Sequence, residues 1–318
     1  MGQQQKIIAV VGATGAQGGG LVQAILADPK GGFKVRAITR NPKSDKGKAL
    51  AAAGAEVVAA DLDDEKSLDR AFAGAYGAFC ITNFWEHNSA EKELAQATNM
   101  AKAAKAAGLQ HVVWSTLEDT RRWVPLSDNR LPTLHGKYKV PHFDAKGEAD
   151  DVFRREGVPT TFLLTAFYWD NFIYFGAGPQ RMPDGKLALV FPLDDKRLPA
   201  IAAEDIGKAA YAIFKRGKEF IGRTVGIAGE HLTGAQLAAG LSRAIGQEVG
   251  YANVPPEVYR SFGFPGADDL GNMFQFKRDF NEYFCGARDM NFSRSLVPDM
   301  QTYEQWLARH KDQIPIPA

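Results

Sequence analysis

A glycine-rich stretch near the amino terminus, KIIAVVGATGAQGGG at residues 6–20, constrains the fold most strongly. Its apolar run, residues 7–11, leads directly into Gly12, Gly15 and Gly18, and an amphipathic segment follows at residues 21–27. This order predicts a strand, a glycine-rich turn and a helix. Glycines let such a turn bend sharply and approach a pyrophosphate closely, and the N–H groups and dipole of the helix start favour its charge. The alternative interpretation is an ordinary tight turn.

Strand-like and helix-like segments alternate after this turn. Strands are expected at residues 34–39, 56–60, 77–82 and 110–115, one helix ends near residue 53, and a long one spans residues 91–107. Alternation of this kind indicates a parallel sheet with helices on both faces. We therefore predict an α/β fold, a Rossmann doubly wound parallel sheet with a smaller C-terminal α+β domain. The expected domains are residues 1–166, with returning segments at about 200–228, and residues 167–318, and the two are interleaved.

The second half of the chain carries more helical than strand patterns. Strands are expected at residues 158–164 and 224–228, and helices at 140–156, 203–214, 255–262, 267–276 and 302–310. A further helix over 233–245 begins with Thr233, a preferred capping residue. A dense aromatic group follows the strand at 158–164, and it lines either an apolar pocket or a core between domains. Its members are Phe167, Tyr168, Trp169, Phe172, Tyr174 and Phe175.

Two basic residues follow the second strand, where a dinucleotide fold meets the adenosine ribose. Arg40 and Lys43 stand where an acidic residue would bind the 2′-hydroxyl of NAD, and Arg accommodates the 2′-phosphate of NADP. This pattern favours NADP(H) over NAD(H), and the alternative is a solvated basic strand end. Asp61 and Leu62 end the third strand, so Asp61 is expected either to accept a hydrogen bond from the adenine amino group, with Leu62 on the ring, or to cap the helix that opens near Asp64.

The end of the fourth strand is expected beside the nicotinamide half of a dinucleotide, because ligands bind at the carboxyl ends of parallel strands. Asn83, Phe84 and Trp85 follow this strand, and the two aromatic rings either stack on a ligand ring or pack in the protein. Cys80 lies inside the strand and is expected to be inert core. On the helix at 140–156, His142 and Lys146 are spaced i, i+4 and therefore share one face.

Several segments together resemble the NmrA-like branch of the atypical short-chain dehydrogenases, over nearly the whole chain. They are GATGAQGG, TRNP, the Asp61-Leu62 pair, TNFWE, HFDAKGEAD and GFPGADDLGNMF. The resemblance implies NADP(H) binding and a regulatory role, in which the NADPH/NADP ratio sets conformation and partner binding. The cofactor contacts that it implies, together with those argued above, are Gly12, Thr14, Gly15, Ala16, Gln17, Gly18, Arg40, Lys43, Asp61, Leu62, Thr82, Asn83, Phe84, Lys146, Tyr168 and Asn171.

The resemblance leaves catalysis open. Typical short-chain dehydrogenases pair a tyrosine acid with the lysine four residues later, and here His142 stands at the tyrosine position before Lys146. His142 could serve as the acid because imidazole titrates near neutrality, Lys146 could serve if its pKa is lowered, or Lys146 only holds the ribose. The expected function is an NADP(H)-responsive regulator, and the alternative is an NADPH-dependent reductase of a hydrophobic carbonyl or quinone-like substrate.

Composition excludes several other classes of protein. The net charge of +1 gives no general attraction to nucleic acid or anionic membranes. Two cysteines form neither a disulfide framework nor a metal-ligand spacing, so no metal is expected and a reducing compartment is favoured. The opening MGQQQK lacks the regions of a signal peptide, which predicts a cytoplasmic protein with nuclear access left open. The expected partners are NADPH, a regulatory protein or a small apolar substrate, with the chain a monomer or homodimer.

Overall fold

The computed structural model describes residues 5–317, so the first four residues, on which part of the targeting expectation rests, lie outside the described part. The chain divides into two compact units. Unit 1 comprises Met1–Asp119, His142–Leu164 and Glu204–Val225, and unit 2 comprises Thr120–Pro141, Thr165–Ala203 and Gly226–Ala318. Residues 120–141, which fall inside the expected 1–166 domain, therefore cluster with unit 2.

Unit 1 is built on a seven-stranded sheet with the order β11-β6-β5-β4-β1-β2-β3. The pairings from β3 through β6 are all parallel, which confirms the predicted Rossmann arrangement. Because β1 lies between β2 and β4, the strand order reverses beside β1. The strands are β1 (Lys6–Val10), β2 (Phe33–Thr39), β3 (Glu56–Ala59), β4 (Gly77–Cys80), β5 (His111–Thr116), β6 (Thr160–Leu164) and β11 (Thr224–Gly226).

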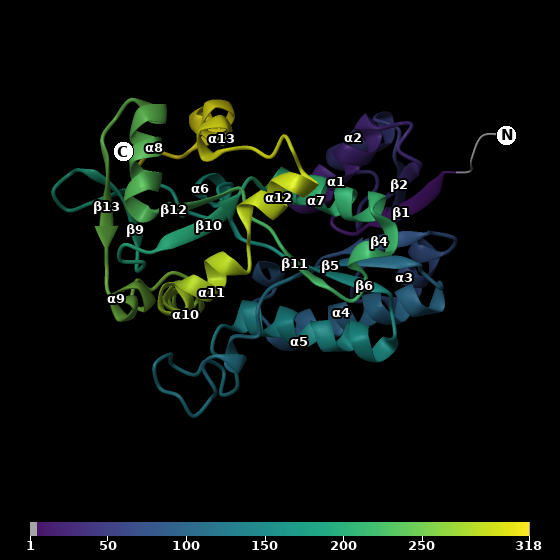
Figure 1. Ribbon diagram of the computed structural model, residues 1–318, viewed down its shortest axis with the longest axis horizontal. Coiled ribbons are helices and arrows are strands. Elements are labelled where there is room, and N and C mark those ends of the chain that lie inside the picture. The colour runs from purple at the N-terminus through teal and green to yellow at the C-terminus, as the bar shows by residue number, and fades with distance from the viewer. Residues whose placement is uncertain (1–4, 318) are drawn as a thin grey trace. The chain divides into compact units, whose positions relative to one another are not determined.

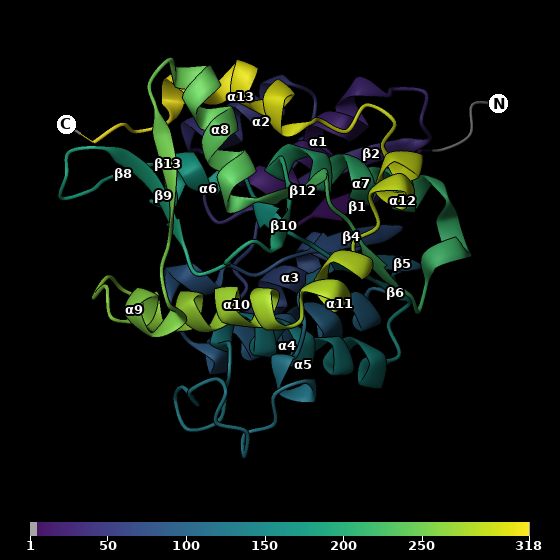
Figure 2. The same cartoon turned by 60° about the vertical axis from the view of Figure 1, so that its left-hand side comes forward.

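Helices cover both faces of this sheet. Figures 1 and 2 both show α3, α4 and α5 on one face and α1 and α7 on the other. The helices of this unit are α1 (Ala16–Ala27), α2 (Asp45–Ala52), α3 (Glu65–Phe72), α4 (Ala90–Ala106), α5 (Pro141–Glu156) and α7 (Ala203–Lys215), with short 3-10 turns η1 (Phe84–Glu86) and η3 (Gly217–Phe220). The predicted helices at 91–107, 140–156 and 203–214 are confirmed to within a residue of either end.

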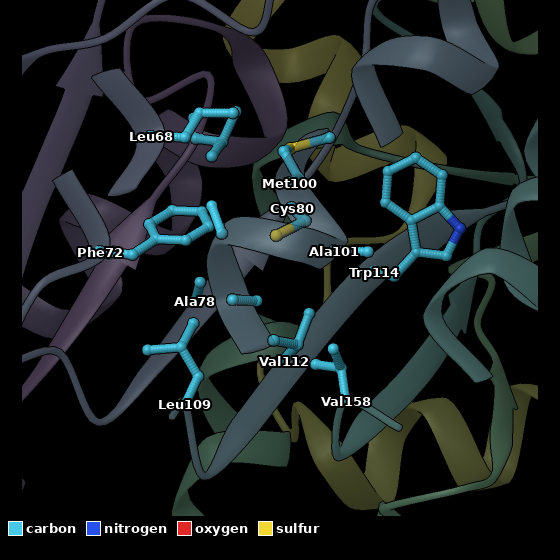
Figure 3. Packing of buried hydrophobic residues seen from close by; sticks show 14 of the residues in the cluster. Leu68, Phe72, Ala78, Cys80, Met100, Ala101, Leu109, Val112, Trp114 and Val158 are labelled. Carbon is cyan, nitrogen blue, oxygen red and sulfur yellow. The ribbon is translucent and has the colours of Figure 1, made fainter. Parts of the chain in front are cut away.

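The core of unit 1 lies between the sheet and the helices α3 and α4 (Figure 3). Phe72 from α3 and Met100 from α4 pack there against Val112 and Trp114 of β5, and all four are fully buried. Cys80 of β4 points into the same cluster, and its burial raises the pKa of the thiol far above the ordinary value. The thiolate is therefore inaccessible, and the expectation of an inert core cysteine is confirmed.

Helices α1 and α7 touch backbone to backbone. A Cβ atom on Gly20 would lie 2.4 Å from the carbonyl oxygen of Glu204, and one on Gly207 would lie 2.1 Å from the amide nitrogen of Leu21. The Tyr211 hydroxyl also donates to Asp28 Oδ2 at 2.8 Å, just past the end of α1. The first helix is thus held by a segment from much later in the chain, one of the predicted returning segments.

Unit 2 contains two three-stranded sheets, of order β12-β10-β7 and β13-β9-β8, together with helices, which confirms the α+β expectation. Its strands are β7 (Phe167–Tyr168), β8 (Gln180–Arg181), β9 (Leu187–Phe191), β10 (Arg197–Ile201), β12 (Glu230–Thr233) and β13 (Val249–Asn253). Its helices are α6 (Asn171–Tyr174), α8 (Gly234–Ile245), α9 (Pro256–Arg260), α10 (Ala267–Asp279), α11 (Asn281–Gly286), α12 (Met290–Leu296) and α13 (Tyr303–His310), with 3-10 turns η2 (Thr120–Arg122) and η4 (Lys311–Gln313).

Thr233 caps α8 as predicted, and its hydroxyl accepts the amide of Gln236 in a capping box. Two other expectations need correction. The strand expected at 224–228 ends at Gly226, because the backbone then leaves the sheet and the amide of Ala228 donates to Ser293 Oγ instead. The helix expected at 255–262 stops at Arg260, and the Phe262 amide closes a turn onto the carbonyl of Tyr259.

Candidate functional site

The glycine-rich turn folds its backbone tightly upon itself. Gly12 adopts a φ of +66°, in the left-handed region that favours glycine. A Cβ atom on Gly18 would lie 2.4 Å from the carbonyl oxygen of Gly12, so no side chain fits there. Gly15 is less crowded, with 3.3 Å to the same oxygen. The turn and the helix start therefore approach more closely than any other residue type allows.

The start of α1 lacks the capping group that other helices of this unit carry. Its N-cap is Gly15, which has no side chain to accept the first amides, and no acidic residue lies in the first turn. By contrast, α2, α3 and α4 begin with capping side chains from Ser44, Asp64 and Ser89. A helix start of this composition suits an anion, because no carboxylate of its own first turn or N-cap already pairs with its amides and dipole.

A side-chain contact fixes the turn to the sheet. Ser115 Oγ, near the end of β5, donates to Gln17 Oε1 at 2.8 Å, and both side chains are buried. The amide of Val11 also donates to the carbonyl of Phe79 on β4 at 3.0 Å. Thr14 is half-buried and Ala16 exposed at the outer side of the turn. The turn thus lies between β1 and β4, where the strand order reverses and where such sheets bind ligands.

Arg40 lies exposed just past the end of β2, and its side chain is already paired. Its guanidinium donates to Glu86 on η1, with the two side chains 66% and 46% exposed. The Glu86 carboxylate raises the pKa of Arg40 further. Lys43 is exposed nearby, and its amide donates to Asn41 Oδ1 at 3.0 Å. The residue predicted to hold a 2′-phosphate therefore has a carboxylate beside it that the sequence reasoning did not identify.

The alternative role expected for Asp61, capping of the next helix, is wrong. Helix α3 begins at Glu65, so its cap is Asp64, whose Oδ1 accepts the amide of Ser67 at 3.3 Å. Asp61 Oδ1 instead accepts the amide of Asp63 at 3.0 Å, and Asp61 as a whole is exposed. Leu62 is half-buried and packs against the core of unit 1. Adenine recognition by Asp61 and Leu62 stays a prediction.

Lys146, on α5, is held by three acceptors. Its Nζ lies 2.7 Å from Thr82 Oγ1, 3.2 Å from the Thr82 carbonyl oxygen and 2.7 Å from Glu93 Oε1. The Thr82 hydroxyl in turn donates to Glu93 Oε1 at 2.6 Å. An ammonium group has three protons to donate. Two hydrogen bonds to Thr82 and the ion pair with Glu93 therefore hold the ammonium group in place.

Glu93, from the first turn of α4, is the buried counter-charge of this cluster. Its side chain is 0% exposed and that of Lys146 is 12% exposed. Its second oxygen, Oε2, lies 3.6 Å from His87 Nε2, beyond hydrogen-bond distance. The amide of Ser89 donates to His87 Nδ1 at 3.2 Å, so the ring proton of neutral His87 resides on Nε2 and faces Glu93. We refer to Thr82, His87, Glu93 and Lys146 as the lysine cluster.

His142 lies one helical turn before Lys146, as predicted, but it is buried among aromatic rings. Its ring centroid is 4.9 Å from that of Trp85 and 5.9 Å from that of Phe84. Phe143 packs on its other edge at 4.8 Å. These contacts support a packing role for His142 over the acid role, and packing of Phe84 and Trp85 in the protein over stacking on a ligand ring. Asn83 is exposed just before η1.

Side chains of β5 fix the position of α5. Asp150 Oδ1 accepts hydrogen bonds from Thr116 Oγ1 at 2.7 Å and from Trp114 Nε1 at 3.1 Å. The Trp114 ring also lies under the Lys146 ammonium, 5.3 Å from centroid to nitrogen. A Cβ on Gly147 would meet the amide of Asp119 at 2.3 Å, so helix and strand end touch through the backbone. Lys146 is therefore presented by a rigidly packed helix.

The remaining predicted residues lie in unit 2. Tyr168 is half-buried with its hydroxyl 3.4 Å from Thr165 Oγ1, and Asn171 opens α6. Their roles toward a cofactor stay predictions. The aromatic group around them divides by exposure, because Phe167, Trp169 and Phe172 are buried while Tyr174 and Phe175 are exposed.

Across residues 5–317, no helix combines the length and apolar character needed to cross a membrane. Within the same residues, no group of three or more His, Cys, Asp and Glu side chains is arranged to hold a metal ion.

Comparison with known proteins identifies one matching family profile and several relatives similar in sequence. The sequence matches the profile of the NmrA-like family over residues 4–307. It is 30% identical to the NmrA-like family domain-containing oxidoreductase FrzB of Cladobotryum sp. over 85% of this chain and 83% of that protein. It is 32% identical to the nitrogen metabolite repression protein nmrA of Emericella nidulans over 80% of this chain and 70% of that protein.

A solved structure agrees in fold over nearly its whole length. The crystal structure of NmrA, a negative transcriptional regulator, in complex with NADP matches with a TM-score of 0.77 and 28% identity, and covers 96% of this chain and 95% of that one.

Proposed function

This chain belongs to the NmrA-like family, and from that premise we propose that it binds NADP(H) through unit 1 and acts as a regulator that responds to the NADPH/NADP ratio. The related NmrA protein is a transcriptional regulator crystallised with NADP. In this proposal the cofactor is the signal, and a regulatory protein reads the resulting conformation.

The residues present fit a phosphorylated dinucleotide. Gly12, Gly15 and Gly18 allow the tight turn that leads into an uncapped helix start, where a pyrophosphate would bind, and Arg40 with Lys43 supplies positive charge for the 2′-phosphate. Lys146 would meet the nicotinamide ribose. A bound cofactor would supply a hydride only in the reductase alternative, and in this proposal the chain's own contribution is to bind and orient the cofactor.

The observation that carries the regulatory reading is that Lys146 is held by Thr82 and Glu93. Its nitrogen is hydrogen-bonded to two oxygens of Thr82 and ion-paired with Glu93. A proton donor in a reductase must instead reach the substrate oxygen, at hydrogen-bond distance or through one water. His142, the other candidate acid, is buried among aromatic rings. A binding site whose two proton donors are both committed to the protein supports sensing over turnover.

A reductase is the second candidate. Several relatives, FrzB among them, are named oxidoreductases, and the Lys146 side chain retains 12% exposure. In that case Lys146 or His142 would donate the proton to a hydrophobic carbonyl or quinone-like substrate.

Two measurements on the purified protein test the choice. Equilibrium titration should give tight NADPH binding that differs from NADP, and steady-state NADPH oxidation against carbonyl and quinone compounds should give no turnover. Lys146→Ala should weaken both cofactors, whereas Lys105→Ala, which removes an exposed lysine paired with Glu156 on the same unit, should not. Turnover that disappears in Lys146→Ala would establish the reductase, and equal affinity for NADPH and NADP would remove the basis for sensing.

A further inference from the structure

We propose that Glu86 is a specificity-determining residue, whose carboxylate competes with the adenosine 2′-phosphate for the Arg40 guanidinium. This inference rests on the proposed binding of NADP(H) to unit 1. It assigns to a residue outside the predicted cofactor contacts the task of setting how strongly the site prefers phosphorylated dinucleotides.

The position of Glu86 is fixed by its own turn. Its amide donates to the carbonyl of Asn83 at 3.2 Å, and the next amide, of His87, donates to the carbonyl of Phe84 at 3.2 Å. Phe84 is buried and packs edge-on against Trp85 at 5.4 Å. The η1 backbone is therefore anchored, while the half-exposed Glu86 side chain reaches the guanidinium at the end of β2.

The charges around Arg40 are mostly acidic. Glu86 pairs with it directly, and Asp61 and Asp63 also act on its charge from the end of β3. Asp63 is itself paired with Lys92 at 2.9 Å and hydrogen-bonded to Gln96 at 2.9 Å, and the exposed Lys43 follows Arg40 by three positions. An entering phosphate must therefore either displace Glu86 or sit beside it.

Displacing Glu86, or binding beside it, costs binding free energy only for a dinucleotide that carries a 2′-phosphate. A 2′-phosphate is repelled by the Glu86 carboxylate and needs the same guanidinium donors. A 2′-hydroxyl is neutral and can donate a hydrogen bond to a carboxylate. Glu86 therefore weakens the binding of NADPH relative to the binding of NADH. A higher NADPH concentration is needed to fill the site, and the preference for NADPH that Arg40 provides is reduced.

Glu86→Gln tests this by keeping the shape of the side chain and removing its charge. Affinities for NADPH and NADH are measured by titration at low salt. We expect the Kd for NADPH to fall about five-fold, the scale of an exposed charge pair, with NADH unchanged or weaker. The gain should shrink at high salt. Glu65→Gln is the control for a general field, because Glu65 is also 46% exposed but pairs with Lys102 at 3.9 Å and not with Arg40.

The outcomes distinguish a failure of the Glu86 inference from a failure of the proposed function. Equal gains for NADPH and NADH, or an equal gain in Glu65→Gln, would overturn the competition and indicate only a general field. A gain that persists when Arg40 is also replaced by Ala would overturn it as well. Wild-type binding of NADPH with no gain in Glu86→Gln rejects this inference alone, whereas no binding of either dinucleotide by folded wild-type protein rejects the proposed function and this inference together.

Discussion

The glycine-rich turn and the cations around it are built by different means. The turn at residues 12–18 is shaped by backbone contacts so close that a single Cβ on Gly18 would collide with Gly12. The side chains of Arg40 and Lys146 are held by ion pairs, Arg40 with Glu86 and Lys146 with Glu93. A substitution that adds a colliding side chain to such a turn should disrupt its shape outright. Loss of one partner of an ion pair should instead cost free energy in proportion to how deeply the pair is buried. The predictions below test that contrast.

The largest effect on cofactor affinity is expected from a substitution in the glycine-rich turn. Gly18→Ala places a Cβ 2.4 Å from a backbone oxygen, so the turn must open. We expect NADPH affinity to fall at least about a hundred-fold and the unfolding free energy to fall by about 2 kcal/mol, the usual scale of overpacking. Titration and thermal denaturation measure both.

The neighbouring Gly19→Ala is the control, because its Cβ would meet the nearest atom at an ordinary 3.5 Å. Similar binding losses in both variants would show that helix composition, and not the shape of the turn, decides affinity. Gly15→Val, at the less crowded position, should abolish binding while the sheet stays folded.

The second effect concerns the buried member of the lysine cluster. Glu93→Gln leaves the ammonium of Lys146 with only neutral acceptors in a mostly buried place. Removing one partner of a buried pair typically costs about 3–5 kcal/mol, and the 12% exposure of Lys146 puts our expectation at about 3 kcal/mol. Denaturant unfolding of unliganded protein measures it.

The double variant Glu93→Gln with Lys146→Met removes both charges and should recover part of that loss. A double variant less stable than either single one would mean that the pair is not the source of the effect.

The smallest effect is expected at the exposed cation. Arg40→Ala should weaken NADPH by about 2 kcal/mol, near thirty-fold, the scale of hydrogen bonds to a charged group, and should leave NADH little changed. Arg70→Ala, which removes another exposed arginine on α3, should alter neither. Equal losses for NADPH and NADH in Arg40→Ala would contradict its assignment to the 2′-phosphate.

Local signals explain what the sequence predicted well. The apolar run before Gly12 and the helix after it are readable because strand, turn and helix leave separate periodic marks. Thr233 was recognised as a cap because capping depends on a few consecutive residues. His142 and Lys146 were placed on one helix face by their spacing alone.

Long-range features were not readable in the same way. Glu93 lies in a helix start rich in charge, EKE, where a solvated face is the ordinary expectation, and only its pairing with Lys146 fifty-three positions later explains its burial. Glu86 gives no local sign of contact with Arg40. The strands β8 and β10 of unit 2 are short or contain a proline, so they lack clear alternation. Asp61 and Asp64 are both plausible caps, and only the helix start decides between them.

The close contact of Gly20 with Glu204 bears on how the chain matures during synthesis. Helix α1 is translated well before the helix that covers its glycine face, because Glu204 follows Gly20 by 184 positions (204 − 20). Until then the helical layer on that face of the sheet (Figure 1) is incomplete, and a product truncated before Gly207 would leave the glycine face of α1 uncovered. Carboxyl-terminal truncation should therefore destabilise the segment that comes first in translation.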